Sequence, residues 1–199
     1  MPYQSLFPTT VFQDHQPQLA EYCLPIAHDY LTRLGEQFMD QPAHWSTYRS
    51  SAAAGALVQD QQMLPVYDLI RRSAESYLDH MSIDYSAYSF KPFYFFNSVG
   101  PGSGHSMHSH PGSVLSGCFY LDSAADSPPI VFKDPRAYTE FIQYPLAANR
   151  MPTARSLIPE YTQAVHPGLL VMWPSWLAHT VPMSHSINPR ITLSFNLDA

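Results

Sequence analysis

Apolar residues in the first part of the chain recur at helical spacing in two stretches. The first stretch predicts an amphipathic helix through Leu19, Tyr22, Cys23, Ile26, Ala27, Tyr30, Leu31, Leu34 and Phe38. Asp40-Gln41-Pro42 is expected to end it. A second helix is expected to begin near Pro65, with an apolar stripe formed by Val66, Leu69, Ile70, Ala74, Tyr77, Leu78 and Met81. Residues 1–14 suggest an extended entry segment, and the small and polar residues 43–62 suggest a loop.

The residue pattern of the chain changes from Tyr85 onward. Short aromatic and β-branched runs alternate there with Pro, Gly, Ser and Asp, which is typical of short strands joined by turns. Strands are expected near 92–99, 114–121, 129–133, 168–173, 179–183 and 190–197. The region 137–163 reads as irregular, with one further strand expected around Phe141.

A helical part followed by many short strands predicts a mainly β fold with N-terminal helices. The expected architecture is a double-stranded β-helix (jelly-roll, cupin-like) barrel with the helices packed on one face. We expect a single domain over residues 1–199, in which 1–84 form a helical support region and 85–199 form the β-barrel.

The last expected strand has two distinct faces. Arg190, Thr192, Ser194 and Asn196 alternate with Ile191, Leu193 and Phe195, so polar and apolar side chains point to opposite sides. An ordinary polar face would meet water, but a barrel that binds a charged ligand needs this face turned inward. We favour the inward orientation, because the strand starts with an arginine shortly after a histidine.

Composition narrows the class of protein. The 199 residues suffice for one sizeable core, and 45% hydrophobic against 13% charged residues excludes a disordered chain. A net charge of −6 without a basic cluster argues against a nucleic-acid partner, and no apolar run suggests a membrane partner or signal segment. Two cysteines far apart predict no disulfide framework and a reducing, cytoplasmic location. The expected partner is a small-molecule or otherwise unidentified substrate; the oligomeric state stays open, and a homodimer is one possibility.

Histidines are concentrated in the stretch GSGHSMHSHPGSVLSG, residues 102–117. His108 and His110 lie two positions apart, so both imidazoles can share one face of a strand and reach one metal ion. His179 begins a later strand that could return to the same site. Ten histidines in the chain make some clustering by chance possible, and His105 is a rival ligand whose spacing suits a loop better than a strand.

Two histidines and a carboxylate form the facial triad of non-haem Fe(II) oxygenases. Three protein ligands on one side of the ion leave its other positions open for substrate and oxygen. In this chain His110 stands where the triad has a carboxylate. A third neutral ligand would leave more positive charge on the ion.

Arg190 is a candidate anion clamp. Its guanidinium can bind a carboxylate through two hydrogen bonds, and Thr192 shares its face and can add a hydroxyl donor. Together they would hold the far carboxylate of a short dicarboxylate whose other end chelates the metal. The alternative is a surface arginine in an ordinary salt bridge.

For four other residues we favour a structural role over a functional one. Arg136 in the Asp134-Pro135-Arg136 segment could meet an anionic substrate, although a simple turn explains it better. Trp173 and Trp176 could stack on a substrate ring, but core packing is the simpler interpretation. Cys118 lies in an apolar strand and is expected to be inert.

Three sequence blocks carry a resemblance to a known family. They are H-x-H-P-G-S-x-L-S-G-x-x-Y-L at 108–121, D-P-R at 134–136, and P-G-x-L-x-x-x-P-S-W-L-x-H-x-V-P at 167–182 followed by R-I-T-L-S-F-N at 190–196. Over roughly residues 90–197 the chain resembles a family of 2-oxoglutarate–Fe(II) oxygenases whose substrates are largely unassigned. The resemblance implies a double-stranded β-helix fold, an Fe(II) centre and 2-oxoglutarate as co-substrate.

The resemblance also implies roles for individual residues. By position, His108, His110 and His179 would be the metal ligands, and Arg190 would anchor a 2-oxoglutarate carboxylate. Asn97, Tyr120 and Asn196 would line the pocket. The implied reaction is an oxidative decarboxylation that consumes O2, yields succinate and CO2, and hydroxylates a substrate.

Two other classes of function remain open at this point. A cupin-like metal dioxygenase or isomerase with three histidines would not use 2-oxoglutarate. Gly102, His108 and His110 fit one cupin motif, but Ser113, Val114 and Leu115 stand where its glutamate is expected, and Arg190 would have no role. A non-catalytic jelly-roll binding protein is the other alternative.

Overall fold

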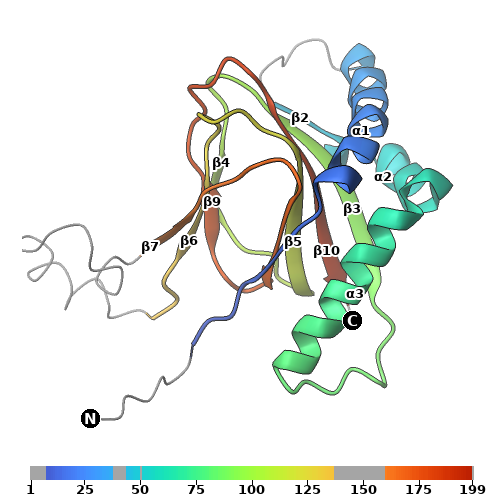
Figure 1. Ribbon diagram of the computed structural model, residues 1–199, viewed down its shortest axis with the longest axis vertical. Coiled ribbons are helices and arrows are strands. Elements are labelled where there is room, and N and C mark those ends of the chain that lie inside the picture. The colour runs from blue at the N-terminus through green and yellow to red at the C-terminus, as the bar shows by residue number, and fades with distance from the viewer. Residues whose placement is uncertain (1–7, 38–43, 50, 137–159, 199) are drawn as a thin grey trace, which may run out of the picture.

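The structure is a computed structural model that describes residues 8–37, 44–49, 51–136 and 160–198. Two antiparallel β-sheets face each other, and three α-helices cover the outer face of the larger sheet (Figure 1). The strand expected around Phe141 lies outside the described residues. None of the described helices combines the length and hydropathy that a membrane span requires.

The helices follow the apolar stripes of the sequence. Helix α1 spans Pro17–Gln37, and α3 spans Leu64–His80 with a proline in its first turn. The buried face of α3 is the predicted stripe as far as Leu78. Between these helices the loop expectation for 43–62 is wrong. That segment forms strand β2 (His44–Ser46), the short helices η1 (Thr47–Arg49) and η2 (Gln61–Met63), and helix α2 (Ser51–Gln59). Its run of alanines favours a helix, whereas we gave more weight to its small, polar character.

The larger sheet has the strand order β1-β8-β5-β10-β3-β2. Its long central strands are β3 (Lys91–Val99), β5 (Ser113–Asp122) and β10 (Arg190–Asp198), with β8 (Leu169–Pro174) beside β5. The N-terminal entry segment adds β1 (Phe12–His15) along β8, and β2 pairs with β3. The region expected to be helical therefore contributes an edge strand on each side of this sheet.

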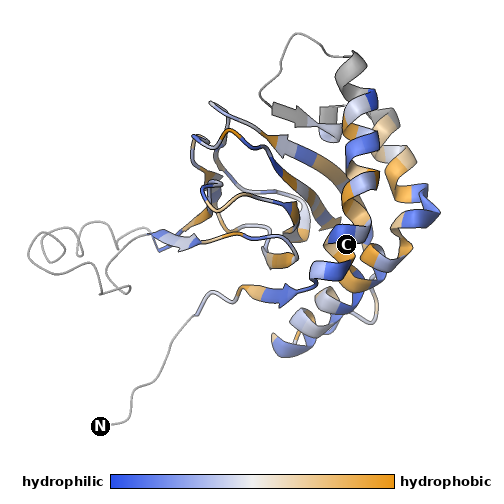
Figure 2. Ribbon diagram, turned by 45° about the horizontal axis from the view of Figure 1, so that its top comes forward, coloured by the Kyte–Doolittle hydropathy of each residue, from blue (hydrophilic) through white to orange (hydrophobic). Residues whose placement is uncertain are grey.

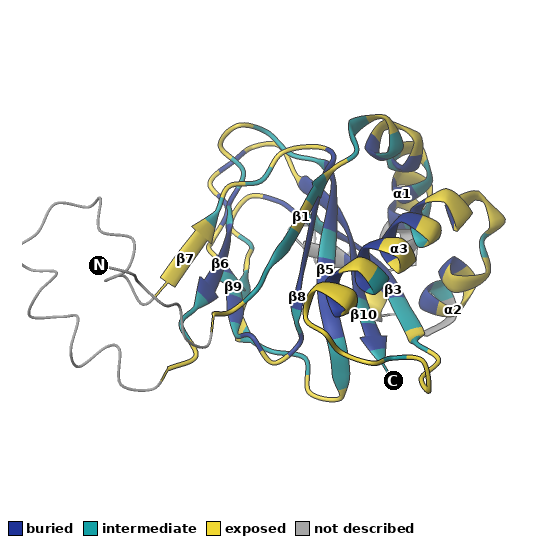
Figure 3. Cartoon of the chain, turned by 60° about the horizontal axis from the view of Figure 1, so that its bottom comes forward, coloured by how far each residue is buried: buried dark blue, intermediate teal, exposed yellow. Residues whose placement is uncertain are grey.

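The smaller sheet has the order β4-β9-β6-β7, and each of its strands has three or four residues. Its strands are β4 (His105–His108), β9 (His179–Val181), β6 (Ile130–Lys133) and β7 (Glu160–Gln163). We placed His105 in a loop and residues 160–163 in an irregular region, and both expectations are wrong. Strands β4 and β7 are too short and too polar for alternation to reveal them, and β7 is largely exposed (Figure 3).

From β3 to β10 the chain changes sheet at every step except between β6 and β7, which pair within the small sheet, and this is the connection pattern of a jelly roll. This confirms the predicted class, mainly antiparallel β with N-terminal helices. The six predicted strands correspond to β3, β5, β6, β8, β9 and β10.

Two hydrophobic clusters hold these layers together. The larger one lies between the helices and the large sheet and includes Phe96, Leu193 and Phe195. The smaller one lies between the sheets and includes Phe132 and Trp173. Figure 2 shows the alternation of apolar and polar residues along the helices that produces this packing.

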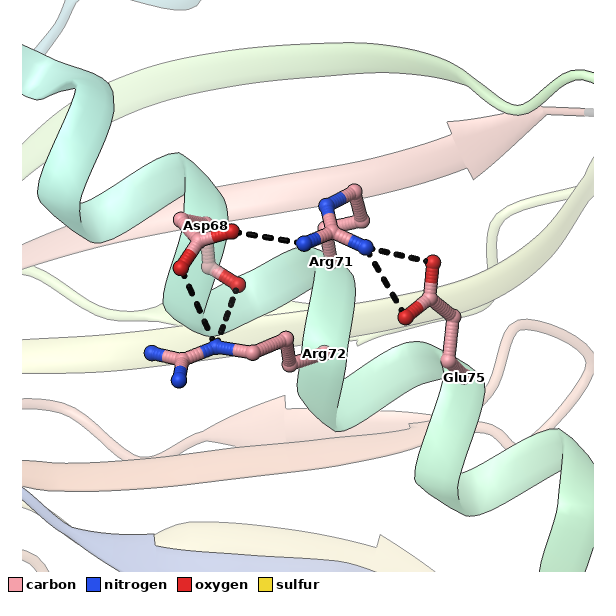
Figure 4. Close-up of polar contacts among 4 residues, drawn as sticks. All are labelled: Asp68, Arg71, Arg72 and Glu75. Carbon is pink, nitrogen blue, oxygen red and sulfur yellow. Dashed lines mark hydrogen bonds and ion pairs between the residues drawn. The ribbon is translucent and has the colours of Figure 1, made fainter.

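Helix α3 presents charged residues on its outer surface. Arg71 donates to Asp68 at 2.6 Å and to Glu75 at 2.7 Å, and Arg72 lies 3.1 Å from Asp68 (Figure 4). All four side chains are more than one third exposed. Pairs at this spacing on an exposed helix add little to stability, so the buried stripe fixes the position of α3.

Candidate metal and 2-oxoglutarate site

Three histidines meet at one end of a cavity between the two sheets. One ring nitrogen from each of His108, His110 and His179 lies within 4.8 Å of the others. The ring centroids of His108 and His179 are 4.4 Å apart, and His110 lies 5.0 Å from His108 and 5.2 Å from His179. This geometry is suited to one metal ion held by three imidazoles.

Strand pairing places two of these histidines opposite each other. His108 ends β4 and His179 begins β9, and the two are direct partners in the small sheet. A register shift separates this pair from the preceding pair of His105 with Val181. His105 also lines the cavity, 6.1 Å from the His108 ring, but is not one of the three clustered histidines.

His110 lies just beyond the end of β4, where backbone bonds hold it. Its N–H donates to the Ser175 carbonyl at 2.9 Å, and its own carbonyl accepts from Ser113. Gly112 has a φ of +98°, which only glycine adopts readily, and it turns the chain from His110 into β5. The sequence Pro-Gly after His110 is therefore the local cause of its position.

Hydrogen bonds orient two of the imidazoles. Nδ1 of His179 is 3.0 Å from the Leu177 carbonyl, and Nδ1 of His108 is 2.7 Å from the Ser106 carbonyl. A carbonyl only accepts, so each Nδ1 carries the proton and each Nε2 keeps its lone pair for a metal. These second contacts make both rings competent ligands.

Burial favours the neutral form of two of the histidines, His110 and His179. It lowers the pKa of His179 to about 3, and the pKa of His110 to about 4 with a contribution from nearby His108. Neutral imidazole is the form that binds a metal. The site therefore offers unprotonated nitrogen at physiological pH.

Arg190 lies in the same cavity and is 3% exposed. Its Nη1 donates to the Pro128 carbonyl at 2.7 Å, and its guanidinium carbon lies 5.4 Å from the centre of the Tyr120 ring. Its buried Nε has no hydrogen-bond partner, and no described carboxylate pairs with it. The alternative of a surface salt bridge is thus wrong, and a buried guanidinium with a free donor fits an anionic ligand.

The polar face of β10 turns inward. Arg190, Thr192 and Ser194 are buried, and all three line the cavity with the half-buried Asn196. Asn97 donates to the Ser194 hydroxyl at 2.9 Å. Asn97 and Tyr120 also line this cavity, whose volume including its open mouth is about 480 Å³.

Other side chains singled out in the sequence have clearer positions. Arg136 is exposed and bonds back to Asp134, which supports the turn interpretation. Trp173 is buried and lines the cavity, whereas Trp176 is 57% exposed, so core packing is wrong for Trp176. Burial raises the pKa of the Cys118 thiol, consistent with an inert side chain.

Sequence reasoning missed several polar residues of the site. Ser116 and Ser175 are buried and hydrogen-bonded to each other at 2.7 Å beside the histidines. Ser116 alternates with Cys118 and Tyr120 along β5, so the period of a strand could have revealed it. Ser175 lies in a turn and gave no such signal.

Comparison with known proteins decides the family. A family model described as "Putative 2OG-Fe(II) oxygenase" matches residues 94–196, about half of the chain. The chain belongs to this 2OG-Fe(II) oxygenase family. The family confirms the resemblance drawn from the sequence, makes the protein an oxidoreductase, and implies Fe(II) and 2-oxoglutarate as cofactor and co-substrate.

Solved structures share the fold of this oxygenase. A prolyl-4-hydroxylase from Pseudomonas putida matches with a TM-score of 0.59 and 13% identity, covering 96% of this chain and 92% of that one. HygX from Streptomyces hygroscopicus, solved with nickel, 2-oxoglutarate and hygromycin B, matches with a TM-score of 0.53 and 11% identity. That match covers 96% of this chain and 83% of HygX. At this identity the likeness supports the jelly-roll fold alone.

Two further comparisons add less. An oxidoreductase of the 2OG-Fe(II) oxygenase family from Burkholderia pseudomallei has 18% identity to this chain. The match covers 56% of this chain and about half (47%) of that protein, and its TM-score of 0.39 is too low to support an argument. No curated protein matches the sequence.

Proposed function

We propose that this oxygenase hydroxylates a still unidentified substrate with O2, converting 2-oxoglutarate to succinate and CO2. The observation that carries the proposal is the pairing of three clustered imidazoles with a buried guanidinium that has no carboxylate partner, in one cavity. Family membership supports the same co-substrate.

The residues present fit the implied groups. Three neutral nitrogen donors suit a divalent transition metal with open coordination positions, although Fe(II) oxygenases usually have one carboxylate among them. His108, His110 and His179 would hold Fe(II). When bound, that metal would supply the redox chemistry that couples decarboxylation of 2-oxoglutarate to oxidation of the substrate by O2.

The protein would position the co-substrate. Arg190 would bind the carboxylate of 2-oxoglutarate farthest from the metal, with Nε and Nη groups as donors. Thr192 would add a hydroxyl donor from the same face of β10, and Tyr120 packs against the guanidinium. Asn97 and Asn196 would complete the polar lining.

The cavity walls would protect the reaction from water. Phe132 and Trp173 pack beside His179, with ring centroids 6.1 and 4.8 Å from its ring. Exclusion of water strengthens the charge interactions of a bound carboxylate.

The test is anaerobic titration of Fe(II)-loaded protein with 2-oxoglutarate, followed by the visible absorption band of the chelate. A saturable band is expected for the native protein, and none for His179→Ala. His28→Ala, at an exposed position on α1, is the matched control and should keep the band. Slow formation of succinate in air should accompany the band.

Two results would refute the proposal. Iron that binds fully to His179→Ala would show that the three histidines are not the site. Iron that requires His179 but gives no band and no succinate would instead favour the cupin-like alternative.

A further inference from the structure

The charge in the cavity is unusual for a facial-triad site. Among the described lining residues, Arg190 is the only one with a permanent charge, and no Asp, Glu or Lys is present. The usual triad includes a carboxylate, but here the third donor is the neutral His110. If the proposed function holds, a divalent metal, Arg190 and doubly negative 2-oxoglutarate together leave one positive charge without a counterion.

A row of three side chains crosses the large sheet next to the histidines. Ser116 on β5 is the direct partner of Trp173 on β8 and of Asn196 on β10. Directly opposite residues of antiparallel strands share one face. Trp173 and Asn196 line the cavity, and the Trp173 ring lies 4.8 Å from that of His179.

Hydrogen bonds fix which way the Asn196 amide points. The Ser116 hydroxyl donates its single proton to Oδ1 of Asn196 at 2.8 Å, so the Ser175 hydroxyl must donate to Ser116. The backbone carbonyl of Ser175 accepts the backbone N–H of His110. With its oxygen occupied, Asn196, which lines the cavity, has an amino group that no described acceptor uses.

Trp173 supplies a second donor in the same row. The residue is 1% exposed, and its buried Nε1 has no hydrogen-bond partner. A buried N–H without an acceptor is costly and rare in folded proteins. Two N–H groups without acceptors thus flank Ser116, close to the proposed metal position.

We propose that the Trp173–Ser116–Asn196 row is a subsite for a carboxylate group of the primary substrate. The carboxylate would accept from the Asn196 amino group and the Trp173 indole, and would neutralise the excess positive charge of the cavity. The substrate class is therefore a carboxylic acid, supplied either as a free acid or as an acidic side chain.

The test uses protein loaded with Co(II) and saturated with 2-oxoglutarate without O2. Binding of acetate and of uncharged acetamide is followed by the paramagnetic relaxation of their methyl protons. We expect saturable relaxation by acetate, with acetamide at least about tenfold weaker. Short capped peptides with a central Asp or Asn, compared in the same way, distinguish a side-chain source from a free acid.

Substitutions at Asn196 separate this subsite from direct metal binding. Asn196→Leu removes the donors and Asn196→Asp adds a repelling charge, so both should weaken acetate binding about tenfold or more. Each variant is saturated with 2-oxoglutarate before acetate is added, so that a change in co-substrate affinity does not enter the comparison, and far-UV circular dichroism shows that both variants fold. Gln62→Glu, an exposed change in η2, is the charge-matched control and should leave acetate binding unchanged.

Different outcomes would overturn the carboxylate subsite and the proposed function. Acetate that binds no better than acetamide, or as well to Asn196→Leu as to the native protein, would overturn the inference while leaving the proposed function intact. Failure of the native Co(II) protein to bind 2-oxoglutarate would overturn the proposed function, and the inference with it.

Discussion

Replacing Arg190 by methionine should separate ligand binding from stability. The guanidinium is buried, makes one bond to the Pro128 carbonyl and has an unpartnered Nε, so the ligand-free protein carries a buried charge without a counterion. Removing a buried, uncompensated charge is commonly neutral or stabilising. We therefore expect Arg190→Met, without ligand, to unfold at the same temperature as the native protein or higher.

Binding of 2-oxoglutarate should respond in the opposite direction. Loss of a buried charge-assisted contact costs about 2–5 kcal/mol, which raises Kd roughly 30-fold to 5,000-fold. At a concentration of about 100 times the native Kd, ligand stabilises the native protein by about 2.7 kcal/mol. For a chain of this size that is a rise in Tm of roughly 5–11 °C. The same concentration should stabilise Arg190→Met by about 0.9 kcal/mol or less.

Thermal unfolding of metal-loaded protein with and without 2-oxoglutarate measures both quantities. Arg33→Met, an exposed arginine on α1, is the matched control and should keep the full ligand-induced shift. A native-sized shift in Arg190→Met would refute the anion clamp. A lowered Tm in the absence of ligand would refute the argument about the buried charge.

Three further predictions follow from other features. Because burial lowers the pKa values of His110 and His179 in the folded protein, protonation of these histidines in the unfolded chain should reduce the stability of the metal-free protein as pH falls below 6.5. At pH 4 the loss for His179 should reach about 3 kcal/mol, as urea unfolding between pH 7 and pH 4 would show. A rise in stability over the same range would contradict it. Gly117→Ala should destabilise the protein by ~1–3 kcal/mol, because the new methyl would meet the Phe195 ring and lie 2.6 Å from a backbone carbonyl oxygen; an unchanged urea midpoint would contradict this packing. Arg71→Ala should leave Tm unchanged despite its ion pairs, and a clear drop would show that the surface of α3 matters more than its exposure indicates.

Strong patterns made most of the fold predictable. The stripe of α3 and the alternation of β10 belong to long elements in which apolar and polar side chains lie on different faces, where periodicity is clearest. Strands β4 and β7 of the small sheet were not predicted, because each has four residues and depends on pairing with a distant segment. Helix α2 was not predicted, because we gave more weight to the small, polar residues of the segment than to the helix preference of its alanines.

The site was predictable only in part for a related reason. His108 and His179 stand out by residue type and by their places at predicted strand ends, and Arg190 stands out by its place on the polar face of its strand. The donor row through Ser116 depends on which strands are neighbours, which no local pattern reveals. The register of β5 between β8 and β10 was therefore needed to find it.

The short strands of the small sheet have a consequence for exchange of the metal. The proposed ligands lie at the end of β4, just beyond it, and at the start of β9, where few backbone bonds resist local opening. Segments of this kind open far more often than long central strands. A bound ion would cross-link these segments, so amide hydrogens of β4 and β9 should exchange with solvent more slowly once it is present. The rate of metal release would then be limited by local opening of the small sheet, without opening of the larger sheet.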